Sequence, residues 1–230
     1  MIQFNRPFDP GKMKLLIFDL DGTLIDSRQD LINSMNATLS HFGRPELSPE
    51  VITAYVGDGP PMLVRRAFGD STDERLLREA TEFFLAFYSV HRIDCTRAFP
   101  GVGEMLVSAQ ASKNGVKRYL TVLSNKPADL AASILAELGI GRFFKSVYGG
   151  NSFSTQKPDP LGAKTILEQT GTPPELGLVV GDSPNDVLTG RSAGMWTCGV
   201  TYGFAPSTLR LAEPDLLVDT TSELMSLFPS

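Results

Sequence analysis

Short apolar runs, each about the length of one strand, recur along the chain and limit its fold more than any other feature. Most of them contain β-branched residues, which favour strands. They lie at residues 15–18, 119–123, 146–148, 176–180, 196–200 and 215–219. Helical patterns separate the later runs. This alternation predicts βαβ units, and therefore a parallel sheet covered by helices on both faces.

Start and stop signals mark two of the expected helices. In residues 127–139, Pro127 stands near the first helical position and Gly139 follows the last turn. In the second helix, Asp159 is a candidate N-cap residue, with Pro160 behind it and Gly171 at the end. Both segments are therefore expected to cross between strands of the sheet.

The segment from Ser27 to Arg97 breaks the alternation, because it contains no convincing strand. Ser27 and Asp30 resemble a capping box at the start of a first helix, and residues 60–69 and 73–92 also have helical patterns. The predicted fold class is α/β. A Rossmann-like, doubly wound parallel sheet is expected from residues 13–26 and 98–230, with an all-helical domain inserted at residues 27–97.

Composition and charge exclude several classes of protein. The chain has 230 residues, 42% hydrophobic and 20% charged, and a net charge of −5, which argues against a broad nucleic-acid surface. It has no apolar run of membrane-spanning length and no signal-peptide pattern, so a cytoplasmic protein without a membrane partner is expected. Cys95 and Cys198 lie far apart and predict neither a disulfide framework nor a zinc site.

Polar side chains follow several of the expected strands, at the edge of the sheet where open α/β proteins bind ligands. Asp19 and Asp21 come directly after the first run, and they would point the same way if the strand continued through them. An aspartate can attack phosphorus as a nucleophile, and a second carboxyl group can move protons. The ordinary alternative is one solvated carboxylate plus a turn aspartate.

The other polar segments also have two interpretations each. Ser124 and Asn125 could bind phosphate at a helix N-terminus, but they are also ordinary capping residues. Lys157, before Pro158, could neutralise a phosphate or be a simple surface lysine. Asp182 follows a strand, as a Mg²⁺ ligand would. Asp186 fits either a metal site or a capping box in which Ser183 is the N-cap.

Taken together, the segments resemble a known family. "DLDGT" at 19–23, "SN" at 124–125, "KP" at 157–158 and "GDSPND" at 181–186 are similar, in this order, to the motifs of the haloacid dehalogenase-like hydrolase superfamily. Within it, "VGDG" at 56–59, "LSNKP" at 123–127 and "VTYGF" at 200–204 resemble the phosphoglycolate phosphatases. The resemblance implies that residues 27–97 are a helical cap over the α/β core.

The resemblance also implies roles for the acidic residues. Asp19 is implied to be the nucleophile and a Mg²⁺ ligand. Asp21 is implied to be the acid/base and to offer its backbone carbonyl to the metal. Asp182 would ligate Mg²⁺, and Asp186 would support the site directly or through water. The cation is also expected to relieve the repulsion between Asp19 and Asp21.

Phosphate binding is implied for a second group of residues. Ser124 would bind the transferring phosphoryl group, with Gly22 and Asn125 beside it. Lys157 would neutralise both Asp19 and the phosphate. In the expected cap, Arg65 and Arg66 could meet a substrate carboxylate or could simply be solvated.

The activity implied is Mg²⁺-dependent hydrolysis of a small phosphorylated metabolite, with 2-phosphoglycolate as the first candidate, by a monomer or homodimer. A pyrophosphatase or sugar-phosphate phosphatase on the same scaffold stays open. Asp21 argues against the dehalogenase branch. The phosphomutase branch resembles a pattern with Thr and His where this chain has Ser27 and Leu31. A phospho-acceptor signalling module is a further alternative, opposed by Asp21 and by the long helical insertion.

Overall fold

The computed structural model describes residues 2–69, 73–110 and 118–228. The chain forms two compact units, one made of Met1–Ile25 with Ala98–Ser230 and the other of Asp26–Arg97. The first unit is an α/β domain, and the second consists of helices. Each unit is described separately below.

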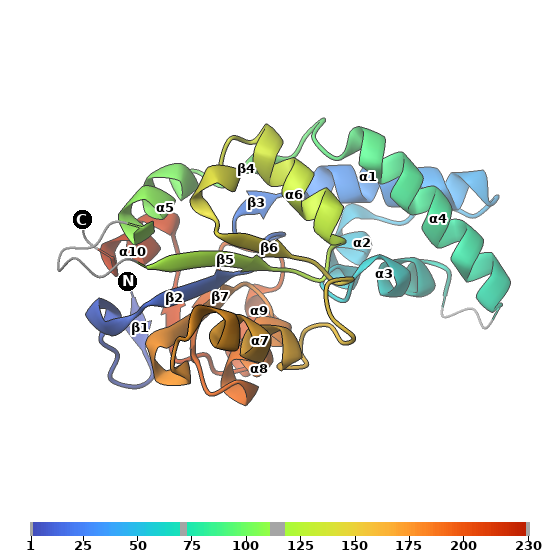
Figure 1. The fold of residues 1–230 in the computed structure, drawn as a ribbon. Helices are drawn as coiled ribbons and strands as arrows, with labels where there is room; N and C mark the ends of the chain where they lie inside the picture. The colour runs from blue at the N-terminus through green and yellow to red at the C-terminus, as the bar shows by residue number, and fades with distance from the viewer. Residues whose placement is uncertain (1, 70–72, 111–117, 229–230) are drawn as a thin grey trace. The chain divides into compact units, whose positions relative to one another are not determined.

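A seven-stranded sheet forms the centre of the α/β unit, in the order β1-β9-β8-β7-β2-β5-β6 (Figure 1). All neighbouring strands are parallel except β1, which pairs antiparallel with β9. The strands are β1 (Gln3–Phe4), β2 (Leu15–Phe18), β5 (Tyr119–Leu123), β6 (Ser146–Tyr148), β7 (Gly177–Gly181), β8 (Trp196–Val200) and β9 (Leu216–Val218). The predicted parallel sheet is confirmed, and all six apolar runs form strands. β1 was not predicted, because its two exposed residues carry no apolar pattern.

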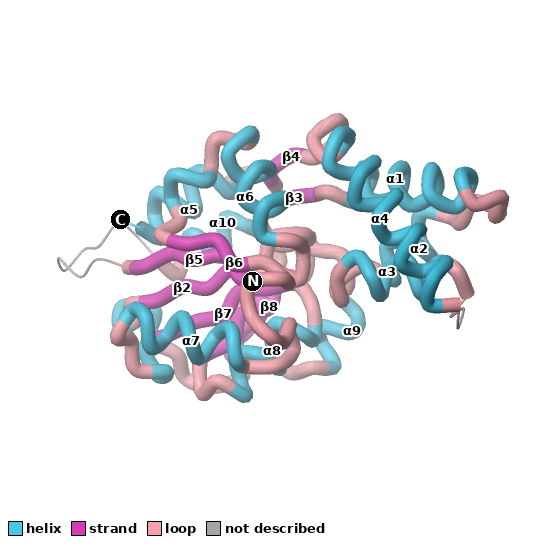
Figure 2. The backbone as a smooth tube through the Cα atoms, turned by 45° about the vertical axis from the view of Figure 1, so that its right-hand side comes forward, coloured by secondary structure: helices cyan, strands magenta, loops and turns pink. Residues whose placement is uncertain are grey.

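Helices cover both faces of the sheet. α5, α6 and α10 lie on one face, and α7, α8 and α9 lie on the other (Figures 1 and 2). Their bounds are α5 (Val102–Gln110), α6 (Ala128–Glu137), α7 (Leu161–Thr170), α8 (Pro184–Ser192), α9 (Pro206–Leu211) and α10 (Thr221–Ser226). The described part of this unit also contains the short 3₁₀ helices η1 (Pro10–Lys12), η2 (Gly141–Phe143) and η3 (Pro174–Leu176).

Caps of the crossover helices lie within one residue of their predicted positions. α6 begins directly after Pro127. α7 begins one residue later than predicted: Pro160 occupies the N-cap position, and Asp159 Oδ1 accepts a hydrogen bond from Leu161 N at 2.9 Å. Gly171 ends α7 with a φ of 61°, a left-handed conformation that glycine adopts without steric cost.

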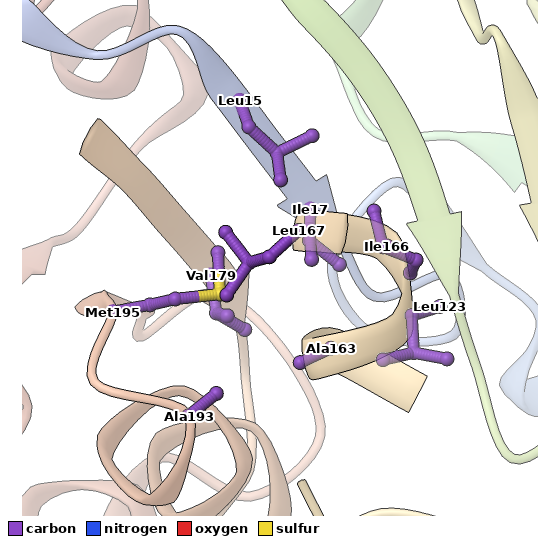
Figure 3. Close-up of a cluster of buried hydrophobic side chains, with 9 residues drawn as sticks. All are labelled: Leu15, Ile17, Leu123, Ala163, Ile166, Leu167, Val179, Ala193 and Met195. Carbon is purple, nitrogen blue, oxygen red and sulfur yellow. The ribbon is translucent and has the colours of Figure 1, made fainter. Parts of the chain in front are cut away.

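β2 is buried along its whole length, because helices cover both faces of the sheet. Leu15 and Ile17 belong to a cluster that packs β2 and its neighbours against α7 (Figure 3). Burying each such side chain contributes about 1.5–3 kcal/mol. The cluster is Leu15, Ile17, Leu123, Ala163, Ile166, Leu167, Val179, Ala193 and Met195. This packing fixes the position of β2, the strand that leads directly to Asp19.

In its described residues, 26–69 and 73–97, the second unit contains the helices α1 (Arg28–His41), α2 (Pro49–Tyr55), α3 (Pro60–Ala67) and α4 (Glu74–His91). Between α1 and Thr96, the described residues include no strand. A separate two-stranded sheet, β3 (Ile25–Asp26) with β4 (Arg97–Ala98), forms where the chain enters and leaves this unit. The seven-residue helix α2 was not predicted.

The capping box predicted from Ser27 and Asp30 is wrong. Ser27 is the N-cap residue of α1 but makes no side-chain capping hydrogen bond. The Asp30 carboxylate is buried and accepts hydrogen bonds from Cys95 N at 2.9 Å, from Thr96 N at 2.8 Å and from Thr96 Oγ1 at 2.7 Å. Asp30 therefore ties α1 to the segment that leaves the unit. A local pattern cannot show this contact, because its partners lie 65 and 66 residues away.

Candidate active site

Three adjacent strands, β7, β2 and β5, end at the same edge of the sheet. The residues directly after them are Asp182, Asp19 and Ser124. Because the strands are parallel and in register, their carboxyl ends bring these side chains to one place. The predicted site residues therefore lie together, although they come from segments far apart in the sequence.

Three carboxylates gather at this edge. Asp19, Asp182 and Asp186 each offer an oxygen, and these oxygens lie within 4.8 Å of one another. Burial raises the pKa of Asp19 to about 6, although the charge of Lys157 opposes this shift. Burial and the charges of Asp19 and Asp186 also raise the pKa of Asp182 well above its ordinary value. Gathering these carboxylates in ionised form away from water is therefore unfavourable without a cation.

The carboxylate cluster fits a hard divalent cation, which prefers carboxylate oxygens. Asp19 Oδ1 is buried and lies 2.8 Å from Lys157 Nζ. Asp186 already uses both oxygens: Oδ1 accepts from Lys157 Nζ at 2.6 Å, and Oδ2 accepts from Ser183 N at 3.1 Å and from Ser183 Oγ at 2.6 Å. Asp19 and Asp182 are thus better placed than Asp186 to ligate a metal directly.

Lys157 is a buried cation inside the carboxylate cluster, with its side chain only 4% exposed. Its Nζ lies 2.8 Å from Asp19 Oδ1 and 2.6 Å from Asp186 Oδ1. Burial lowers the pKa of Lys157, but the charges of Asp186 and Asp19 outweigh burial and raise that pKa above its ordinary value. The ammonium therefore stays charged. The alternative of a simple surface lysine is wrong.

Asn125 holds the backbone of Lys157 in place. Its side-chain Nδ2 donates to Lys157 O at 2.9 Å, and its Oδ1 accepts from Lys157 N at 3.0 Å. This two-way contact joins the end of β5 to the loop that carries the lysine. Because both amide atoms are engaged, a phosphate contact from Asn125 stays a prediction for its backbone N–H.

The Asp21 carboxylate forms an ion pair with a second buried lysine, Lys126. Lys126 Nζ lies 2.7 Å from Asp21 Oδ1, and the two side chains are 5% and 13% exposed. β2 ends at Phe18, and Gly22, with a φ of 81°, turns the chain after Asp21. The two aspartates are thus separated by pairing with different lysines, before any metal is considered. Lys126 was not predicted to have a role; its position directly after Ser124-Asn125 was the available signal.

A loop after β8 holds Asp182 from the opposite side. Phe204 N donates to Asp182 Oδ2 at 2.6 Å. A Cβ atom on Gly203 would overlap the Asp182 side chain, and so would one on Gly22. Tyr202 Oη also donates to Thr23 O at 3.0 Å, which ties the loop to the turn after Asp21. This loop lies within the "VTYGF" segment, for which no contact with Asp182 was predicted.

A family comparison agrees with this geometry. The family profile described as haloacid dehalogenase-like hydrolase matches residues 16–200, most of the chain. The chain belongs to the haloacid dehalogenase-like hydrolases. The resemblance stated from the motifs is therefore confirmed. In residues 2–69, 73–110 and 118–228 of this hydrolase, no helix is long and apolar enough to cross a membrane.

Comparison with individual proteins shows which kind of haloacid dehalogenase-like hydrolase this chain resembles. The hydrolase is 36% identical over 226 residues to phosphoglycolate phosphatase 1 of Pseudomonas aeruginosa, over 96% of this chain and 82% of the relative. It is 33% identical to the phosphoglycolate phosphatase of Haemophilus influenzae, over 94% of this chain and 98% of the relative. A crystal structure of a predicted phosphoglycolate phosphatase from Haemophilus somnus superposes with a TM-score of 0.87 at 30% identity, over 94% of this chain and 98% of that one. The hydrolase is thus a phosphoric monoester hydrolase of the phosphoglycolate phosphatase type.

Replacing Gly203 with alanine is expected to weaken divalent-metal binding by about tenfold or more, because the added Cβ displaces Asp182 and disturbs its contact with Phe204 N. Isothermal titration of the metal-free hydrolase with Mn²⁺ measures this effect, and circular dichroism checks the fold. Gly103→Ala in α5 is the matched control, since its Cβ meets no atom within 4 Å. Equal Mn²⁺ affinity in the two variants would show that the 202–204 loop does not hold Asp182.

Arg65 and Arg66 of the helical unit are both paired with carboxylates. Arg65 Nη2 lies 2.6 Å from Glu74 Oε1, and Arg66 Nη2 lies 2.5 Å from Asp58 Oδ2. Both arginine side chains are about one third exposed (32% and 30%). A substrate carboxylate would have to compete with these ion pairs. The contacts therefore favour a structural role for both arginines in the hydrolase.

Proposed function

We propose that this hydrolase is a Mg²⁺-dependent phosphomonoesterase that converts 2-phosphoglycolate into glycolate and phosphate through an aspartyl-phosphate. The observation that carries the proposal is the position of Asp19. Its buried carboxylate lies at a strand end, 2.8 Å from the ammonium of Lys157 and beside Asp182 and Asp186. The named relatives support 2-phosphoglycolate as the substrate.

In the proposed first step, an Asp19 carboxylate oxygen attacks the phosphorus, and the bond from phosphorus to the ester oxygen breaks. Asp21 gives a proton to the departing oxygen, so that glycolate leaves as the alcohol. Asp21 then takes a proton from a water molecule that attacks the phosphorus of the aspartyl-phosphate. Phosphate leaves, and the Asp19 carboxylate is restored.

Charge on the phosphoryl group is neutralised throughout this reaction. The buried ammonium of Lys157 supplies one positive charge, and Ser124 with the backbone N–H of Asn125 supplies hydrogen bonds. The backbone N–H of Gly22 already donates to Ile25 O at 2.9 Å, so we do not assign that N–H a direct phosphate contact. Asp19 and Asp182, with the backbone carbonyl of Asp21, are proposed to hold Mg²⁺. Bound there, the ion would lower the electrostatic cost of bringing an anionic substrate to a carboxylate nucleophile.

The helical unit is proposed to act as a cap, with boundaries at residues 27–97. Caps of this kind exclude water from the reacting groups and restrict the substrates that fit. Its compactness and its insertion between β3 and β4 support this role, because the chain passes between the two units only there.

A phosphate-release panel tests the proposed function. Wild-type protein with Mg²⁺ is expected to give its highest kcat/KM with 2-phosphoglycolate, and chelation with EDTA should abolish the release. Sugar phosphates and pyrophosphate are the competing substrates, and the higher kcat/KM decides between them. No release from any small phosphomonoester would refute a phosphomonoesterase. A long-lived aspartyl-phosphate without turnover would instead favour a phospho-acceptor signalling module.

A further inference from the structure

We propose that Lys126 is a positioning residue that holds the acid/base Asp21 apart from the carboxylate cluster, so that Asp21 serves the departing oxygen of the substrate. The inference rests on the proposed function, because it assigns proton transfer to Asp21. It adds a second essential lysine to the site, one that acts on the leaving group instead of on the phosphoryl group.

The contact itself is short and shielded from water. Lys126 Nζ lies 2.7 Å from Asp21 Oδ1, and the side chains are 5% and 13% exposed. A lysine this deeply buried is stable in charged form only when it is paired, so the ion pair constrains both side chains. The two residues lie 105 positions apart and come from the ends of neighbouring strands, β5 and β2.

Asp19 and Asp21 are each paired with a different buried lysine. Lys157 contacts Asp19 and Asp186, both members of the carboxylate cluster. Lys126 contacts Asp21, which is not among the cluster's carboxylates in the described part of the chain. A carboxylate drawn into the cluster would be occupied by a cation or by Lys157. The pairing with Lys126 therefore keeps Asp21 available for proton transfer.

The segment after β5 organises both lysines. Asn125 holds the backbone of Lys157 through two hydrogen bonds, at 2.9 and 3.0 Å. The next residue, Lys126, contacts Asp21, and its own N–H donates to Ser124 Oγ at 3.3 Å. Three consecutive residues thus contribute to the phosphoryl-binding side and the leaving-group side of the site.

Leaving-group dependence tests the inference, since proton donation matters most when the departing oxygen is a poor leaving group. The substrates are 2-phosphoglycolate, ethyl phosphate, which is an alkyl ester without a carboxylate, and p-nitrophenyl phosphate, whose leaving group needs no proton. Lys126→Met is expected to lower kcat/KM, which reports the steps up to release of the alcohol, by roughly a hundredfold on both alkyl esters. The loss on p-nitrophenyl phosphate should be about tenfold smaller than that.

Two comparisons separate positioning from general damage. Lys157→Met should lower kcat/KM on all three substrates to a similar extent, because Lys157 acts on the phosphoryl side. In an Asp21→Asn background, Lys126→Met should change kcat/KM on the alkyl esters by less than about twofold, since no acid is left to position. The double variant removes both buried charges and so leaves neither one unpaired. It can therefore still be compared with Asp21→Asn if Lys126→Met alone folds poorly.

The opposing results are distinct. A Lys126→Met loss that is equal on all three substrates, or that is confined to 2-phosphoglycolate, would overturn the inference; the second result would make Lys126 a contact for the substrate carboxylate. A full further loss in the Asp21→Asn background would overturn it as well. Inactivity of the wild-type protein on every substrate would overturn the proposed function, and the inference with it.

Discussion

Asp19→Asn is expected to abolish turnover, with kcat falling by at least about ten-thousandfold, the order of loss when the nucleophile of a covalent mechanism is removed. The amide has nearly the same shape, and Lys157 keeps its 2.6 Å contact with Asp186, so the fold should survive. Phosphate release from 2-phosphoglycolate measures the effect. Wild-type turnover in the variant would exclude Asp19 as the nucleophile.

The same substitution should change how metal affects stability. Because burial raises the pKa of Asp19 to about 6, the metal-free fold disfavours its ionised form at neutral pH, whereas the unfolded chain does not. Asn removes this cost, so the Tm of the metal-free variant should exceed that of the wild type. The rise in Tm on adding Mg²⁺ should shrink, because a ligand is lost. A full Mg²⁺-dependent rise in Tm would show that Asp19 does not bind the metal.

Asp21→Asn is expected to lower kcat by roughly a hundredfold to ten-thousandfold, since general acid–base catalysis contributes effects of that size. Its Mg²⁺ affinity should stay near the wild-type value, because only its backbone carbonyl is assigned to the metal. Steady-state kinetics and the Mg²⁺-dependent shift in Tm give the two quantities. Equal loss of metal binding in Asp19→Asn and Asp21→Asn would contradict the division of labour between the two aspartates.

The sheet could be predicted from the sequence because its strands are buried on both faces, so that runs such as Leu15–Phe18 are continuously apolar. β1 escaped prediction because it is a two-residue, exposed strand whose only support is its pairing with β9. The capping box predicted from Ser27 and Asp30 was wrong for a related reason. Its spacing suits a local cap, but the partners of Asp30 are 65 and 66 residues further along the chain.

For the site, too, the residues could be predicted from local motifs, whereas the contacts between distant residues could not. Asp19, Lys157, Asp182 and Asp186 follow strand ends or turns in recognisable motifs, and the structure brings them together. The contacts that orient these residues carry no local signal. Lys126 meets Asp21 across 105 residues, and Asn125 meets Lys157 across 32. Such pairs become neighbours only when the strand ends and the loop that carries Lys157 meet at one edge of the sheet, so they become visible only in the fold.

Direct detection of a phosphorylated Asp19 tests the central claim. Asp21→Asn protein, in which hydrolysis of the intermediate is slowed, is mixed with Mg²⁺ and p-nitrophenyl phosphate, whose leaving group needs no proton from Asp21, then quenched in acid and mapped by peptide mass spectrometry. A phosphoryl group on the peptide that contains Asp19, absent when Asp19 is also replaced by Asn, is the expected result. Phosphate release without any phosphorylated peptide, or with the phosphoryl group on another residue, would contradict it.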